Sequence, residues 1–158
     1  MHRYLKTTIG LIAMTLCAFK CSRAQESFLS LQMCVFDENG IDQLKSVMHT
    51  LAKSENLKFI DNSAATGQAL KNIGADKAMS RDASLAVDLH IEGQGGLGVT
   101  AGNLGLPPYQ IALGFTEGSE PGRAHKLAHH VVQALSKRWQ VEQVEQGKGV
   151  FPMKTCGG

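Results

Sequence analysis

The sequence predicts an α+β fold, a two-layer sandwich in which two main helices cover one face of an antiparallel or mixed β-sheet. Apolar and polar residues alternate along 29–35, 85–92 and 109–115, which is the period-two pattern of half-buried strands. Apolar residues recur at helical spacing along 39–54 and 119–135. Elements in this order bury one helix face against one sheet face, which is the two-layer arrangement.

The first half of the chain is predicted to form strand, helix, strand and a weaker helix. Asn39 is expected to cap the first helix, which continues to Ser54. A short strand over 57–60 and a second helix over 66–73 follow, and no element is predicted for 75–82. The apolar stripe of the first helix consists of Ile41, Leu44, Val47, Met48 and Leu51.

The second half is predicted to form two strands, a strong helix and a last strand. Residues 93–108 are rich in glycine and end in two prolines, so we expect one long, flexible hairpin connection between the two strands. Pro121 opens the helix, and a strand over 139–144 follows it. The stripe of this helix consists of Ala124, Leu127, Ala128, Val131 and Leu135.

The order of these elements resembles the ferredoxin-like layout with a small insertion. The resemblance concerns layout alone, and many unrelated functions occur on that fold. It implies a sheet with one face left open to solvent. The residues expected on that open face are Ser30, Gln32, Asp88, His90, Glu92, Gln110 and Thr116.

Residues 1–24 have the three-part layout of a secretory signal peptide. Two bases precede an apolar run over 9–19, and a short polar stretch follows, in which Ser22 and Ala24 place the cleavage before Gln25. An eleven-residue helix rises only about 16 Å against roughly 30 Å of bilayer hydrocarbon, so no stable membrane span is predicted. We therefore expect a mature domain over 25–158 that is periplasmic or secreted.

Charge excludes nucleic acid as an expected partner. The whole chain has a formal charge of +2 and a pI of about 8.4, but four of its sixteen bases lie in the first 24 residues. After cleavage the fourteen acidic residues outnumber the bases that remain. The mature chain then lacks the basic surface that phosphate contacts require.

Cysteine usage agrees with export. Cleavage removes Cys17 and Cys21, and the residues before them fit a lipid-anchor signal poorly. It leaves Cys34 and Cys156, an even pair that predicts one disulfide in an oxidising compartment and a C-terminal tail tied to the domain. The alternative is a reactive or metal-binding thiol, although the chain contains no Cys-x-x-Cys spacing.

Two local patterns suggest a ligand. The glycines of 93–98 resemble a phosphate loop, but no lysine lies within that segment and no helical pattern follows it. His125 and His129 lie one helical turn apart and form a candidate transition-metal pair, whereas His130 falls on another side of the helix. The alternative for the pair is an exposed polar helix flank.

Asp88, His90 and Glu92 share one strand face and form the candidate binding row, with Gln110 on the same face. Carboxylates beside His90 suit a protein-binding surface or a catalytic or metal site. A solvated polar strand face is the alternative. The sequence contains neither a Gly-x-Ser-x-Gly turn nor a cysteine with a plausibly paired histidine, and no cofactor is predicted.

These observations favour an exported, non-enzymatic binding protein of the cell envelope that acts on a protein partner as an inhibitor or accessory protein. A small disulfide-closed domain with a polar sheet face and a long loop is suited to present a surface. The alternatives are a periplasmic transition-metal-binding protein and a small hydrolase built on Asp88, His90 and Glu92.

Overall fold

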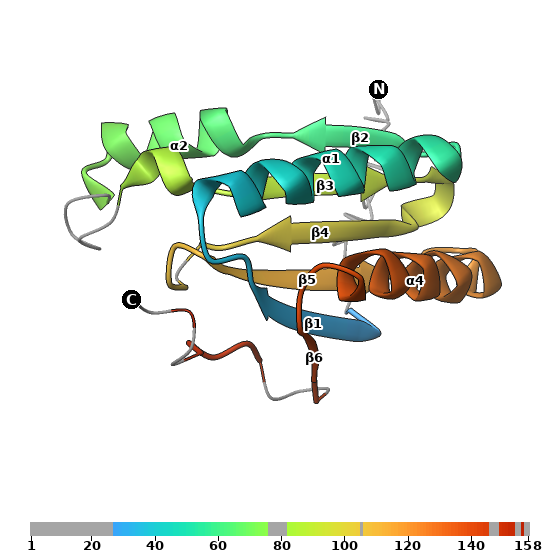
Figure 1. The fold of residues 1–158 in the computed structure, drawn as a ribbon. Helices are drawn as coiled ribbons and strands as arrows, with labels where there is room; N and C mark the ends of the chain where they lie inside the picture. The colour runs from blue at the N-terminus through green and yellow to red at the C-terminus, as the bar shows by residue number, and fades with distance from the viewer. Residues whose placement is uncertain (1–26, 76–81, 105, 146–148, 154–155, 157–158) are drawn as a thin grey trace, which may run out of the picture.

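A computed structural model describes residues 27–75, 82–104, 106–145, 149–153 and 156 (Figure 1). These residues form a six-stranded antiparallel sheet in the order β2-β3-β4-β5-β1-β6. The strands are β1 (Leu29–Cys34), β2 (Lys58–Asp61), β3 (Asp88–Glu92), β4 (Gly98–Gly102), β5 (Gln110–Thr116) and β6 (Val141–Val144). The predicted signal peptide over 1–24 lies outside the described residues.

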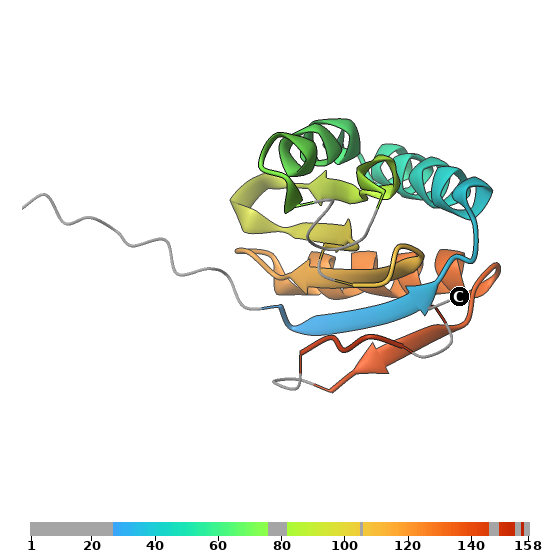
Figure 2. The ribbon, with the colours of Figure 1, turned by 90° about the vertical axis from the view of Figure 1, so that its left-hand side faces the viewer.

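Two helices cover one face of the sheet, which confirms the two-layer α+β class. Helix α1 (Glu38–Ser54) connects β1 to β2, and α4 (Pro121–Ser136) connects β5 to β6. Figure 2 shows both on the same side of the strands. Helix α2 (Ser63–Asn72) lies beyond the end of β2 and contacts the short 3₁₀ turn Ala83–Leu85 and the start of β3.

The observed strand order differs from the ferredoxin-like layout that the sequence suggested. The two strand-helix-strand connections that this layout requires are present around α1 and α4. However, β3 and β4 are inserted between β5 and β2 in the sheet. The chain after α2 therefore runs through β3, β4 and β5 as a meander, and the sheet is wider than predicted.

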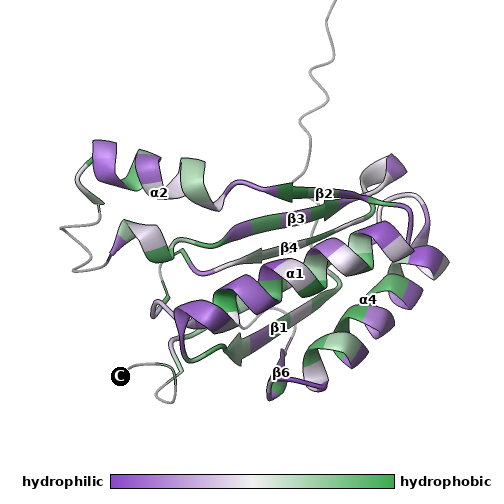
Figure 3. Ribbon diagram, turned by 45° about the horizontal axis from the view of Figure 1, so that its top comes forward, coloured by the Kyte–Doolittle hydropathy of each residue, from purple (hydrophilic) through white to green (hydrophobic). Residues whose placement is uncertain are grey.

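The core lies between the sheet and the two helices. Leu31, Leu113 and Ala101 occupy one cross-strand row on the helix side, and all three are buried. Figure 3 shows hydrophobic and hydrophilic stripes along α1 and α4, as expected for helices with one buried face. The helix residues buried in this core include Ile41, Leu44, Met48, Leu127, Val131 and Leu135.

The start of α1 differs from the prediction by two residues. Asp37, not Asn39, is the N-cap, and its carboxylate accepts a hydrogen bond of 2.6 Å from the Gly40 backbone N–H. A Cβ at Gly40 would lie 2.2 Å from the Val35 carbonyl oxygen, so this close turn requires glycine. Phe36 sits in the turn at φ 65° with 69% of its surface exposed, a strained conformation for a bulky residue.

The prediction of one long, flexible loop over 93–108 is wrong because the segment contains β4. Val99 and Ala101 point to the core and Thr100 to the other face, but glycines at both ends conceal the alternation. The glycines before β4 form a tight turn. Gly95 has φ 66°, and its carbonyl accepts a hydrogen bond of 2.9 Å from the Ser119 N–H.

Candidate functional site

The candidate site is the sheet face opposite α1 and α4, which we call the open face. Two neighbouring rows of side chains cross it, with one residue from each of β1, β5, β4 and β3. The first row consists of Ser30, Gly114, Thr100 and His90. The second row consists of Gln32, Ala112, Gly102 and Asp88. With strands about 4.8 Å apart, small residues make a floor about 14 Å wide between the outer strands.

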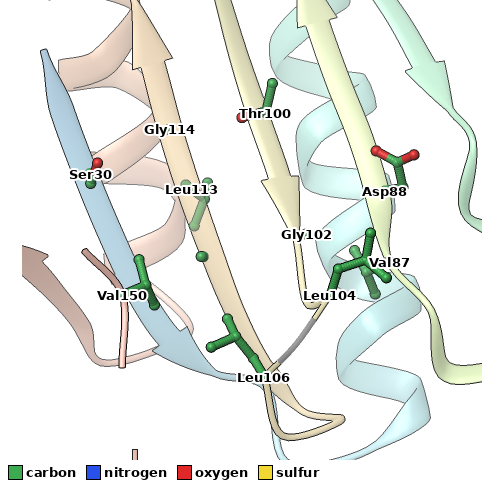
Figure 4. A pocket seen from close by; sticks show the side chains of 11 residues that line it. Ser30, Val87, Asp88, Thr100, Gly102, Leu104, Leu106, Leu113, Gly114 and Val150 are labelled. Atoms are coloured by element: carbon green, nitrogen blue, oxygen red, sulfur yellow. The ribbon is translucent and has the colours of Figure 1, made fainter. Parts of the chain in front are cut away.

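A groove of about 470 Å³ lies over this floor. Figure 4 shows Leu104, Leu106 and Val87 near one end of it and Asp88 on its β3 side. Val150, from the C-terminal tail, lies over β1, on the side of the groove away from Asp88. The residues that line the groove are Ser30, Val87, Asp88, Thr100, Gly102, Leu104, Leu106, Ala112, Leu113, Gly114 and Val150.

The Asp88 carboxylate is held in a defined position at the groove. Its Oδ1 lies 2.7 Å from His90 Nε2, and its Oδ2 accepts a hydrogen bond of 2.8 Å from the Thr66 hydroxyl on α2. Its backbone N–H donates to the Ser63 hydroxyl oxygen at 3.1 Å. Asp88 and His90 are each only partly exposed. The sequence predicted these two side chains on one strand face, and in the structure they are in contact; the part played by Thr66 was not predicted.

Glu92 lies on the same face but apart from this pair. It is exposed at the end of β3, where the register places it between Lys58 and Gly98. The predicted row thus splits into an Asp88–His90 pair and a separate carboxylate. Within the described residues, no serine, threonine or cysteine side chain hydrogen-bonds to His90, and the hydroxyl that contacts the pair, that of Thr66, is bonded to Asp88.

Gln110 was predicted to lie on the exposed polar face, and this prediction is wrong. Its side chain is fully buried under the C-terminal tail. Its Nε2 donates to the Phe151 carbonyl oxygen at 2.8 Å, and its Oε1 accepts from the Met153 N–H at 2.6 Å. The register places Gln110 opposite Cys34, which lies at disulfide distance from Cys156 with the Cα atoms 5.4 Å apart. The predicted cysteine pair is thus formed.

These contacts make the tail one wall of the groove. Two hydrogen bonds and one disulfide hold it against β1 and β5 within a few residues of Val150. The position of that wall therefore depends on the tail's attachment. Sequence reasoning missed this wall and also the small-residue floor, although Ala112 and Gly114 stand at the solvent-facing positions of a clear strand pattern.

The histidines predicted to bind a metal lie on α4, away from the groove. His125 Nε2 is 3.0 Å from Glu117 Oε1, and its ring lies 4.5 Å from the Phe28 ring. His129 is exposed with its ring 6.1 Å from that of His130. Across the described part of the chain, no three histidine, cysteine or carboxylate side chains come together as a metal site. The pair His125 and His129 stays a prediction.

No family model, curated protein or solved structure matches this chain. No helix within the described ranges has both the length and the apolar content to cross a membrane.

Two carboxyl groups near α2 have pKa values below their ordinary value. Burial raises the pKa of Asp61, but hydrogen bonds from the hydroxyl and N–H of Ser63 and the Lys45 ammonium at 3.4 Å together lower it by more. The backbone N–H and hydroxyl of Ser84 lower the pKa of Asp82. Both carboxylates help to fix the chain on either side of α2, next to the Asp88 side of the groove.

Charge is distributed unevenly between the two sides of the molecule. The strands present three carboxylates on the open face, those of Asp88, Glu92 and Glu142, against a single ammonium, that of Lys58. On the helix side, residues 121–138 contain four lysines and arginines and no acidic residue. The strands therefore make the open face acidic, whereas the α4 segment is basic.

Proposed function

We propose that this protein is exported and binds another envelope protein through the groove on its open face, as an inhibitor or accessory protein. The observation that carries this proposal is the groove itself. A sheet with one apolar face covered by helices and the other hollowed and partly apolar offers a surface for a partner. The volume of 470 Å³ suits a few side chains of a protruding segment.

The shape of the site favours a protein over a small metabolite. The groove is bounded by a loop, the tail and one strand, and it stays open along the sheet. Leu104 is 53% exposed on its wall, so apolar surface there remains in contact with water. A protein segment that covers this surface gains its burial free energy, about 25 cal/mol per Å² of apolar area.

Export is supported by the cysteine pair and by the sequence of residues 1–24. Intact mass of the protein purified from its native host tests this part. We expect a chain that starts at Gln25, with both cysteines alkylated only after reduction. A chain that starts at Met1 with free thiols would contradict export.

Affinity capture from an envelope extract tests the partner and the surface together. The baits are the wild type, Ala112→Leu and Ala134→Leu. Both alanines are half-buried. Ala112 lies on the groove floor, whereas Ala134 is a residue of α4 that faces a hollow between α4 and α1. We expect one specific protein to be retained by the wild type and by Ala134→Leu, and to be lost at least about tenfold with Ala112→Leu, because the added side chain fills the groove. Equal retention by all three baits would refute this surface.

A further inference from the structure

The groove combines an apolar end with an acidic side, and this combination restricts what it can hold. The apolar end is formed by Leu104, Leu106 and Val150, which come from the β4–β5 connection and the tail. The acidic side is formed by Asp88, whose side chain is 29% exposed. The floor between them is backbone and small side chains, so a ligand can contact both at once.

We propose that the groove binds an extended segment of the partner in which a lysine or arginine lies next to a large apolar residue. The cationic group pairs with the Asp88 carboxylate, and the apolar side chain packs between Leu104, Leu106 and Val150. This inference rests on the proposed function and adds the chemistry of the segment that is recognised.

Asp88 can accept a further hydrogen bond from a cationic group. Each carboxylate oxygen has two lone pairs, and His90 and Thr66 use one position on each. The carboxylate therefore retains acceptor capacity toward the groove while its orientation is fixed. A guanidinium or ammonium that reaches it forms a charge-assisted hydrogen bond, the stronger class of hydrogen bond.

The wider charge distribution acts in the same direction. Glu92 and Glu142 lie on the open face with Asp88, and Lys58 at the edge strand is the one lysine or arginine that the strands place there. Glu142 accepts a hydrogen bond of 3.2 Å from Gln32, which holds its carboxylate beside the β1 edge of the floor. A basic segment is thus attracted to the open face and repelled by α4. This difference in charge favours binding at the open face in one orientation.

The floor explains why the segment is extended. Gly114, Ala112 and Gly102 bring the sheet backbone to the surface in the middle of the groove. A flat, narrow chain can lie against such a floor, and its successive side chains point in opposite directions. Neighbouring residues can then reach the apolar end and the Asp88 side.

Titration of ¹⁵N-labelled full-length protein with short capped peptides tests the proposal by NMR. The probes are acetyl-Gly-Leu-Lys-Val-Gly-amide and the same peptide with glutamate in place of lysine. We expect millimolar lysine peptide to shift the amide signals of Gly102 and Gly114, and the glutamate peptide to bind at least about tenfold more weakly. In Asp88→Asn, which keeps the size of the side chain, the preference for the lysine peptide is expected to disappear, while Ala134→Leu keeps it.

The outcomes separate this inference from the proposed function. Equal shifts with both peptides, or unchanged discrimination in Asp88→Asn, would overturn the cationic specificity even if Ala112→Leu abolishes capture of a partner. Absence of shifts at Gly102 and Gly114 with the lysine peptide would also overturn it. If capture is in addition insensitive to Ala112→Leu, the proposed function fails as well.

Discussion

Removal of the Cys34–Cys156 disulfide is expected to destabilise the protein strongly and to release one wall of the groove. The bond joins residues 122 positions apart. On the chain-entropy model, a loop of this length constrains the unfolded chain by about 16 cal/mol/K, or about 5 kcal/mol at 25 °C. Because the tail can partly detach in the native state without the bond, we expect a loss of roughly 3 to 5 kcal/mol for Cys34→Ala combined with Cys156→Ala.

Urea unfolding of the double variant and of the wild type under non-reducing conditions measures this loss. Reduced wild type is the control, because its free energy of unfolding should match that of the double variant. Hydrogen exchange at Met153 reports the wall, because its N–H is bonded to the buried Gln110 side chain. We expect this amide to exchange much faster in the variant. A loss below about 1 kcal/mol with unchanged exchange would show that the tail holds its position without the bond.

Three further predictions concern local structure. Asp61→Asn should lower the unfolding free energy at pH 7: the pKa of Asp61 is lower in the folded state, so its stabilisation is present above the unfolded pKa and lost as pH falls below about 4. A deficit in urea unfolding that persists at pH 2 would contradict this. Phe36→Asn should raise stability by about 0.5 to 1 kcal/mol, because asparagine tolerates the left-handed conformation and little buried area is lost; a lower melting temperature would refute it. Gly122→Ala should stabilise α4 by about 0.5 to 1 kcal/mol, because the added Cβ meets nothing within 4 Å. Gly67→Ala should destabilise the protein, because its Cβ would lie 2.4 Å from the Ala83 carbonyl oxygen. Thermal melts that place both alanine variants on the same side of the wild type would show this packing to be wrong.

The helices and strands that the sequence predicted most clearly are those with a strong hydrophobic periodicity. The long apolar alternations gave β1, β3 and β5, and the two apolar stripes gave α1 and α4. Strand β4 was missed because glycine at 98 and 102 has low strand propensity and only Val99 and Ala101 mark its buried side. Its neighbours in the sheet, rather than its own residues, determine its conformation.

The site was predicted only in part for a similar reason. Alternation placed Asp88 and His90 on the open face, and the cysteine count placed the tail near Cys34. Gln110 was expected on the surface because polar residues in strands usually face water, but the tail that covers it is 41 residues away in sequence. The groove depends on such long-range contacts, which no local pattern records.

Photo-crosslinking in the native host tests whether a partner binds in the groove. Benzoylphenylalanine replaces Leu104 on the groove wall in one variant and Gln133, an exposed residue of α4, in another. We expect the probe at position 104 to capture one specific envelope protein and the probe at 133 to capture none. Crosslinks of that protein from position 133 alone, or none from position 104, would contradict a partner-binding groove on the open face.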